Sequence, residues 1–188
     1  MSAPSPALAA FPVPDLPAEG AAEGLSWRRN LPPALDPLSG WFTDAEDMLR
    51  VHPLARFPFA PDEWAELLVR PGLLFVYALD AEGAPFAHFG LRDNAGAAHL
   101  CFLVMDPARR GAGMSRLLIR LTAAVARLAA PGATRMTLYV NNANRRAERL
   151  YLGLGFARNG VTQDDMFQME RPLGLTPPWG ADAPRPTS

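Results

Sequence analysis

The sequence predicts an α/β protein in which helices cover both faces of a central sheet. Strand and helix signals alternate along the chain. The apolar run 100–105 is typical of a buried strand, and the segment 114–128 carries its apolar residues on one helical face. A second strand–helix pair follows at 134–156, and shorter apolar runs precede both pairs. Chains with this alternation usually fold into a sheet with helices packed on it.

Each of the remaining elements is expected from a local signal. Thr43 and Glu46 have the spacing of a capping box, which predicts a helix from there to about 51. Pro71-Gly72 ends a second helix, and 80–83 is a turn between two strands. In chain order these elements are a strand at 25–30, helices at 43–51 and 62–70, strands at 73–79 and 85–91, and a last strand at 166–170.

One domain accounts for most of the chain. The 188 residues, 49% of them apolar, suit a single core, which we assign to residues 25–172. Residues 1–24 are rich in Pro, Ala and Gly and are expected to form a disordered leader. Residues 173–188 are expected to form a Pro-rich tail.

The composition argues against several classes of function. A net charge of −1 does not suit a dedicated nucleic-acid binder, and no apolar run is long enough to span a membrane. Cys101 is the single cysteine and cannot form an internal disulfide, and the first residues lack a secretory signal. We therefore expect a cytoplasmic protein without a membrane or nucleic-acid partner, and no metal site.

The turn that follows the strand ending at Met105 is suited to hold an anion. Gly111 and Gly113 let backbone N–H groups approach a ligand closely, and the dipole of the next helix favours negative charge. The chain has no lysine, which excludes a Walker loop. Arg116 stands where a dinucleotide fingerprint requires its third glycine, which excludes that motif too. A phosphate is the expected ligand.

A second motif lies in the strand–helix pair 134–156. Asn144 is placed to cap the helix, and Gly155 to end it. The apolar face of this helix has i, i+3, i+4, i+7 spacing and consists of Ala147, Leu150, Tyr151 and Leu154.

Together the two motifs resemble the GNAT superfamily of N-acetyltransferases. Arg110, Gly113 and Ser115 match the family's pyrophosphate loop, Arg-x-x-Gly-x-Gly/Ala, with serine as a small replacement at the last position. Residues 144–156 match its Asn-x-x-Ala-x-x-x-Tyr-x-x-x-Gly-Phe segment at every named position. The resemblance implies a mixed, mostly antiparallel central sheet with helices on both faces. It also implies transfer of an acetyl group from acetyl-CoA to a primary amine.

The resemblance further implies a role for each site residue. Backbone groups of Leu103, Val104 and Met105 would face the pantetheine and the thioester. Asn144 would bind the pantetheine arm, and the hydroxyl of Tyr151 would protonate the departing thiolate. The pyrophosphate would be wrapped by the loop residues Arg110, Gly111, Ala112, Gly113, Met114, Ser115 and Arg116.

The acceptor of the amine's proton is not settled by the motifs. Many relatives carry a glutamate early in the strand where this chain has His99. If residues 93–96 form a symmetric turn, His88 and His99 lie diagonally on one face of a hairpin, where two imidazoles would suit proton transfer near neutral pH. The alternative is a hydrogen-bonded strand histidine, with water as the proton acceptor.

The amine acceptor, a small molecule or a protein, is expected to approach between the 41–70 helices and the strand that carries His99. Candidates to shape that pocket are Trp41, Phe42, Asp44, Glu46, Asp47 and Trp64. A non-catalytic module that senses acyl-CoA is the alternative function. The sequence leaves open whether the chain forms a homodimer.

Overall fold

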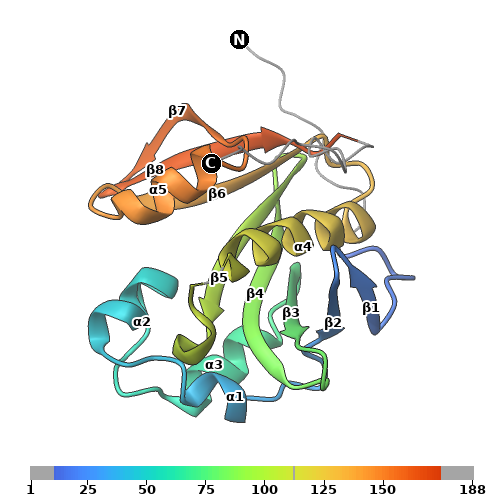
Figure 1. Cartoon of the computed structure of the whole chain (residues 1–188), viewed down its shortest axis with the longest axis vertical. Helices are drawn as coiled ribbons and strands as arrows, with labels where there is room; N and C mark the ends of the chain where they lie inside the picture. The colour runs from blue at the N-terminus through green and yellow to red at the C-terminus, as the bar shows by residue number, and fades with distance from the viewer. Residues whose placement is uncertain (1–10, 112, 175–188) are drawn as a thin grey trace, which may run out of the picture.

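The computed structural model describes residues 11–111 and 113–174 (Figure 1). The strands are β1 Glu19–Ala22, β2 Leu25–Arg29, β3 Leu73–Leu79, β4 Pro85–Asn94, β5 Ala97–Met105, β6 Arg135–Asn141, β7 Ala157–Gln163 and β8 Met166–Pro172. The helices are α1 Asp36–Ser39, α2 Ala45–Val51, α3 Pro61–Leu68, α4 Met114–Ala129 and α5 Arg145–Leu152, with a 3₁₀ turn at Pro107–Arg109.

All the described strands join one eight-stranded sheet in the order β1-β2-β3-β4-β5-β6-β8-β7. Each neighbouring pair is antiparallel except β5 and β6, which run parallel. The expected mixed, mostly antiparallel sheet is therefore confirmed. Crossing from β5 to a parallel neighbour requires a long connection, which α4 supplies.

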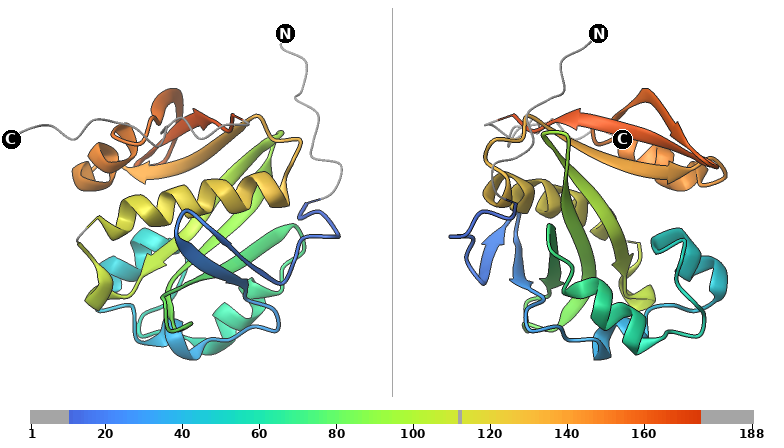
Figure 2. Two further views of the ribbon diagram at one scale, coloured as in Figure 1. Left: turned by 45° about the vertical axis from the view of Figure 1, so that its right-hand side comes forward. Right: turned by 180° about the vertical axis from the view of Figure 1, so that it is seen from behind.

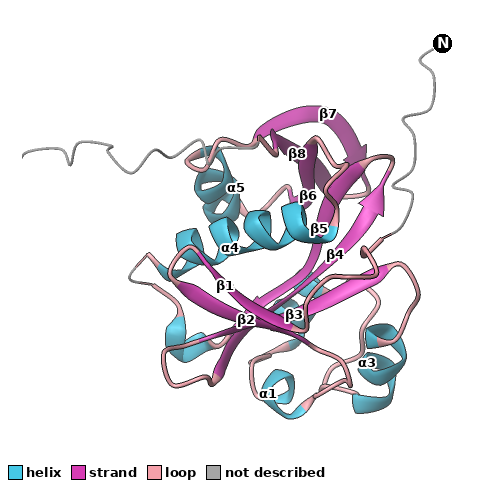
Figure 3. Cartoon of the chain, turned by 90° about the vertical axis from the view of Figure 1, so that its right-hand side faces the viewer, coloured by secondary structure: helices cyan, strands magenta, loops and turns pink. Residues whose placement is uncertain are grey.

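Helices lie on both faces of the sheet, as expected. One apolar cluster joins the sheet to α4 and the inner side of α5, and the other joins it to α1, α2 and α3. Figure 3 shows α4 on the opposite side of β1–β4 from α1 and α3. Because α4 buries a stripe that includes Leu118, Leu121 and Val125, its helical spacing was a reliable signal in the sequence.

The parallel strands β5 and β6 separate soon after they meet. Their pairing is confined to 98–100 on β5 and 136–138 on β6. Beyond Leu100 and Leu138 the two strands diverge, and the opening between them faces α2 and the start of α5 (Figures 1 and 2). Among the described residues, no strand pairs across this opening, so backbone groups on the facing edges can meet a ligand there, except the Met105 carbonyl, which accepts from Arg110.

The structure adds three elements that the sequence signals did not predict: β1, α1 and β7. The first two are only four residues long. Strand β7 is an edge strand whose residues are mostly exposed, and its pairing with β8 is interrupted between Arg158 and Thr162. Short or polar edge strands lack the apolar alternation on which prediction depends.

The expected leader boundary needs correction. Residues 11–24 do not lie apart from the domain, because β1 pairs with β2 and Leu16 is buried in the larger cluster. At the other end Leu173 is also buried, and its N–H donates to the carbonyl of Thr134. The rest of the predicted leader, 1–10, and of the predicted tail, 175–188, lies outside the described residues.

In 11–111 and 113–174, no helix is sufficiently long and apolar to cross a membrane. The same residues contain no group of three or more His, Cys, Asp or Glu side chains that could hold a metal ion.

Candidate active site

The predicted phosphate loop connects the end of β5 to the N-terminus of α4. Gly111 and Gly113 adopt φ values of +101° and +80°, and Gly113 is the N-cap residue of the 16-residue helix. Positive φ is the conformation for which glycine is suited, so both glycines are explained by the backbone. A long helix that starts at such a turn presents the positive end of its dipole there. In the first turn of α4 the Met114 N–H donates to the Gly111 carbonyl at 3.0 Å and the Arg116 N–H donates to the Gly113 carbonyl at 2.9 Å. Ala112, part of the predicted loop, lies outside the described residues.

Arg110, the arginine of the loop motif, forms hydrogen bonds to other residues of the protein. The guanidinium of Arg110 donates to the Asp47 carboxylate at 2.8 Å and to the Met105 carbonyl at 3.3 Å. It therefore ties the loop to α2 and to the end of β5. Arg116, on the first turn of α4, contacts the Gly153 carbonyl at 3.4 Å and so links α4 with the end of α5.

Strand β5 contains a bulge at the opening. Phe102 has a φ of +51°, which is unusual for a residue with a side chain, and the β4–β5 register shifts at the same level. Leu103, Val104 and Met105 lie beyond both the bulge and the last residue paired with β6. The bulge therefore changes the direction of the backbone at residues 103–105, the segment expected to face the thioester.

Helix α5 carries Asn144 and Tyr151 as the sequence predicted. Asn144 is the N-cap, and its side-chain oxygen accepts from the Ala147 N–H at 3.1 Å. Tyr151 is half-buried against the larger cluster, with its ring centroid 5.6 Å from that of Phe156. Burial raises the pKa of the Tyr151 hydroxyl to about 12. The hydroxyl is therefore protonated at neutral pH and is able to donate a hydrogen bond.

The two histidines of the hairpin are core residues. The turn consists of Ala95 and Gly96, both at positive φ, and it pairs Asn94 with Ala97. His99 consequently faces Arg92, while His88 faces Val104 much further along the hairpin. The expected diagonal pair is wrong, because the turn is centred on residues 95 and 96, one residue later than a symmetric turn at 93–96, and this moves the partner of His99 from residue 90 to Arg92.

Burial also changes the chemistry expected of these imidazoles. His88 is 0% exposed and His99 is 3% exposed. Desolvation lowers the pKa of each to about 3, with a smaller contribution from Arg92 at His99. The ring of His99 hydrogen-bonds to the Thr137 hydroxyl at 2.9 Å through Nδ1. A neutral, enclosed imidazole is a weak base, which favours the alternative that His99 is structural.

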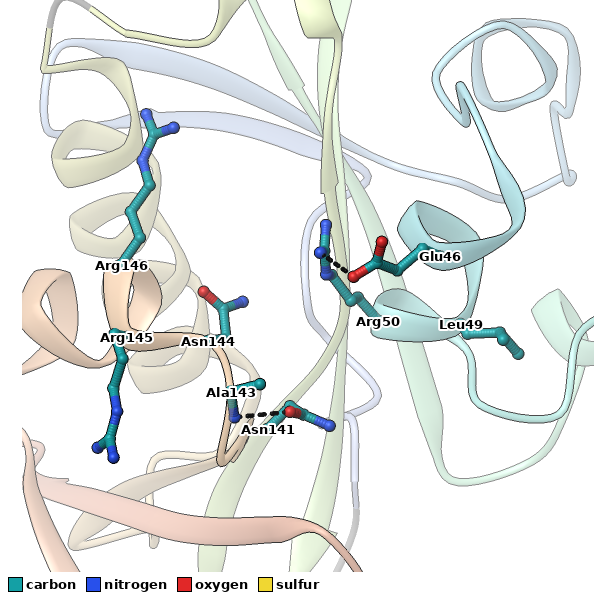
Figure 4. Close-up of a pocket in the computed structure, with 8 residues that line it drawn as sticks. All are labelled: Glu46, Leu49, Arg50, Asn141, Ala143, Asn144, Arg145 and Arg146. Atoms are coloured by element: carbon teal, nitrogen blue, oxygen red, sulfur yellow. Dashed lines mark hydrogen bonds and ion pairs between the residues drawn. The ribbon is translucent and has the colours of Figure 1, made fainter.

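A pocket of about 560 Å³ lies between α2 and the β6–α5 connection (Figure 4). Its α2 wall is formed by Glu46, Leu49 and Arg50. The opposite wall is formed by Asn141, Ala143, Asn144, Arg145 and Arg146. Asn141 is the last residue of β6, so the pocket is found where β6 has left β5.

Of the six residues expected to shape the acceptor pocket, Glu46 alone lines this pocket. Trp41, Phe42 and Trp64 are buried in the smaller apolar cluster instead. Asp44, rather than Thr43, caps α2 by accepting from the Asp47 N–H at 2.8 Å. The sequence did not predict that this pocket is also lined by Leu49, Arg50, Asn141, Ala143, Arg145 and Arg146. Only the Asn-Asn-Ala-Asn turn at 141–144 was a visible signal, because such residues are typical of turns and caps.

Comparison with known proteins gives one consistent result. A profile described as the acetyltransferase (GNAT) family matches residues 38–156. A curated relative, mycothiol acetyltransferase from Kineococcus radiotolerans, is 36% identical over 158 residues, which cover 82% of this chain. The match covers 48% of that relative, so the chain spans about half of its length.

Solved structures share the fold at low sequence identity. The GNAT domain of S. lividans PAT has a TM-score of 0.66 at 17% identity, covering 82% of this chain and 96% of that one. Spermidine N-acetyltransferase from Vibrio cholerae, solved with CoA and spermine, has a TM-score of 0.63 at 16% identity, covering 79% and 95%.

Proposed function

This chain belongs to the acetyltransferase (GNAT) family, and we propose that it transfers an acetyl group from acetyl-CoA to a primary amine in the opening between β5 and β6. The class of enzyme, an acetyl-CoA-dependent N-acyltransferase, follows from the family. The observation that carries the proposed site is the early separation of β5 from β6, which exposes backbone groups beside the N-terminus of α4.

Acetyl-CoA is the proposed co-substrate, held along the loop and the opening. The pyrophosphate would meet the glycine turn and the positive end of the α4 dipole, since the side chain of Arg110 is engaged with Asp47. The pantetheine arm would meet the free edge of residues 103–105 and the amide of Asn144. The V. cholerae structural neighbour was solved with CoA, which supports this class of ligand.

The reaction forms an N–C bond and breaks a C–S bond. The neutral amine attacks the thioester carbonyl, whose oxygen becomes negative and requires a hydrogen-bond donor such as a backbone N–H of the β5 edge. The bond to sulfur then breaks, and the hydroxyl of Tyr151 donates its proton to the departing thiolate. The nitrogen loses a proton to water, and a proton from water restores the Tyr151 hydroxyl. Because its pKa is raised to about 12, this hydroxyl still carries its proton when the reaction begins.

Water is the proposed acceptor of the proton that the amine loses. His99 is enclosed and hydrogen-bonded to Thr137, and neither His99 nor His88 lines the pocket. The proposed acceptor is a primary amine of a small molecule or of a protein, close to the pocket of about 560 Å³ between α2 and the β6–α5 connection. The lone Cys101 needs no oxidising compartment, in keeping with a proposed cytoplasmic location.

A non-catalytic acyl-CoA sensor is not favoured, because the similar proteins are named acetyltransferases. The two functions are separated by measuring release of free CoA from acetyl-CoA across a panel of amines. Binding without amine-dependent release would support the sensor, and amine-dependent release would support the enzyme.

The donor site is tested with Gly113→Glu, and Gly72→Glu is the matched control. Both glycines have positive φ, +80° and +77°, and open space where a Cβ would lie. The backbone strain of the two substitutions is therefore similar, but only Gly113 adjoins the proposed pyrophosphate site. At a ligand concentration about 100 times its Kd, binding adds about 2.7 kcal/mol of stability. We expect acetyl-CoA to raise the melting temperature of the wild type and the control, but not that of Gly113→Glu. Equal stabilisation of all three would refute the proposed site.

A further inference from the structure

We infer that the acceptor amine carries an apolar group, alkyl or aromatic, that packs against the rings of Phe102 and His52 beside the opening between β5 and β6. This inference rests on the proposed function and names the substrate class of the same site. It is carried by the side chains that become accessible where the two strands separate, and by the pairing of the charges on α2.

Strand β5 is buried along its length except at the bulge. Residues 97–100 and 104–105 are buried, whereas Cys101, Phe102 and Leu103 are each partly exposed. This break in burial coincides with the end of the pairing with β6 and with the shift of the β4–β5 register. The side chains that a ligand can meet on this part of β5 are therefore uncharged and mostly apolar.

Phe102 is held between the core and the end of α2. Its ring centroid lies 5.6 Å from that of the buried Phe75 and 5.2 Å from that of His52, the residue that caps the C-terminus of α2. Phe102 also has a φ of +51°, and strained backbone of this kind clusters at ligand sites. The partly exposed rings of Phe102 and His52 thus form one patch between β5 and α2, which we call the bulge patch.

His52 adds no charge to the bulge patch. Half-burial lowers the pKa of its imidazole below 6.5, while Glu63 raises that pKa and Arg70 lowers it to a smaller extent. Its Nδ1 accepts from the Leu54 N–H at 3.3 Å, which places the proton of the neutral ring on Nε2. The ring is therefore neutral at pH 7, and an alkyl or aromatic group can pack on it without desolvating a charge.

The charged side chains of α2 are paired within the protein. Arg50 is paired with Glu46, and Asp47 accepts from Arg110 at 2.8 Å. A charged group on the acceptor would have to compete for one of these partners, whereas an apolar group would not. An apolar group that leaves water for the bulge patch gains the free energy of burying apolar surface. The surroundings of the opening on the α2 side therefore favour an acceptor with an apolar group beside its amine.

The experiment measures CoA release with amines that have the same charge but differ in apolar surface. The probes are phenethylamine against ethanolamine, L-leucinamide against glycinamide, and spermidine as a polar polyamine. We expect kcat/KM to be about tenfold or more higher for the apolar member of at least one pair, since one methylene group in an apolar site is worth about 10–200-fold. The first pair represents a free alkyl or aryl amine, and the second an amine beside an apolar side chain.

Phe102→Leu tests the bulge patch, with Phe59→Leu as the matched control. Both phenylalanines are partly buried against the smaller apolar cluster, but Phe59 lies before α3 and its ring stacks on those of Phe42 and Trp64. Phe102→Leu should reduce the preference for phenethylamine about tenfold, mainly through KM for the amine. It should preserve the rise in melting temperature with acetyl-CoA, and Phe59→Leu should preserve both properties.

Several outcomes would overturn the inference. An unchanged preference in Phe102→Leu, or an equal loss in Phe59→Leu, would show that the apolar group does not bind at the bulge patch. Equal use of both members of each pair, or a preference for spermidine, would contradict an apolar acceptor while leaving the acetyltransferase function intact; this comparison uses the wild type and does not depend on the folding of a variant. Release of no CoA with any of these amines would count against the proposed function itself, and the inference would fall with it.

Discussion

Replacement of His99 by glutamine is the sharpest test of how this site manages protons. The imidazole is buried beside Thr137, and desolvation lowers its pKa from 6.5 to about 3. Between those two values the unfolded chain binds a proton at His99 that the folded chain does not. The contribution of neutral His99 to the free energy of unfolding is therefore fully present above pH 6.5 and is lost as the pH falls toward 3. Glutamine preserves a polar group for the Thr137 hydroxyl without titrating.

The size of the effect follows from the two pKa values. From pH 6.5 to 5.0 the linkage amounts to about 1.4 kcal/mol per pH unit, or about 2 kcal/mol for His99. We expect urea unfolding at pH 7.5 and 5.0 to show a pH-dependent loss that is smaller by this amount in His99→Gln than in the wild type. The comparison within each protein cancels the direct cost of the substitution. His52→Gln is the control, because His52 is only half-buried and its pKa is lowered less.

The rate profile completes this test. If water accepts the amine's proton, His99→Gln should preserve the acidic limb of kcat/KM, since no essential group near pKa 6.5 has been removed. Two results would refute the reasoning. One is an unchanged pH-dependent loss of stability in the variant. The other is an acidic limb near pH 6.5 that disappears with the imidazole.

Further predictions concern α5. Tyr151→Phe should lower turnover by about 10²–10⁴-fold with little change in acetyl-CoA affinity. The matched Tyr139→Phe on β6 should leave turnover within a few-fold of the wild type. The measurement is the steady-state rate of CoA release, and equal rates for both variants would assign Tyr151 to packing. Asn144→Ala should cost about 1 kcal/mol in urea unfolding because the helix cap is lost. Asn144→Asp should recover that stability but not the KM for acetyl-CoA, because a carboxylate caps the helix without supplying the NH₂ donor; recovery of both would show that only the cap matters.

Local periodicity was enough to predict most of the fold. Strand β3 is observed at Leu73–Leu79 as expected, and α4 and α5 start at Met114 and Arg145, directly after their predicted turns. Helix α4 buries a continuous apolar stripe, and the apolar residues of α5 are partly buried against the same cluster. Such stripes can be recognised from adjacent turns of a single segment. The missed β1 and β7 are different, because they owe their strand conformation to hydrogen bonds with β2 and β8. Those partners are specified by tertiary structure rather than by the residues of the strand itself.

The candidate site shows the same contrast between features set by one segment and features set by tertiary structure. The glycine turn before α4 and the Asn144 cap of α5 are each contained in one short segment, so the sequence could predict their conformation. The pocket brings Glu46 and Arg50 of α2 against Asn141 and Arg146, which lie far along the chain, and no local pattern links these segments. The histidine prediction failed for a related reason. A turn centred one residue later than expected shifted the pairing of His99 by two residues, which preserved its face but moved it away from His88.

The motif arginine shows how the two halves of the site are connected. Arg110 belongs to the loop motif by sequence, yet its guanidinium binds the carboxylate of Asp47. Asp47 directly follows Glu46, which lines the pocket. Asp47 also lies 3.9 Å from Arg50, so the carboxylate stands between the loop and the acceptor wall. A surface pair of this kind contributes little to stability, about 0–1 kcal/mol. Its consequence is geometric. Through Arg110, the ion pair to Asp47 and the hydrogen bond to the Met105 carbonyl link the proposed pyrophosphate site to α2 and to the end of β5. We expect this link to help position the acceptor amine relative to the thioester.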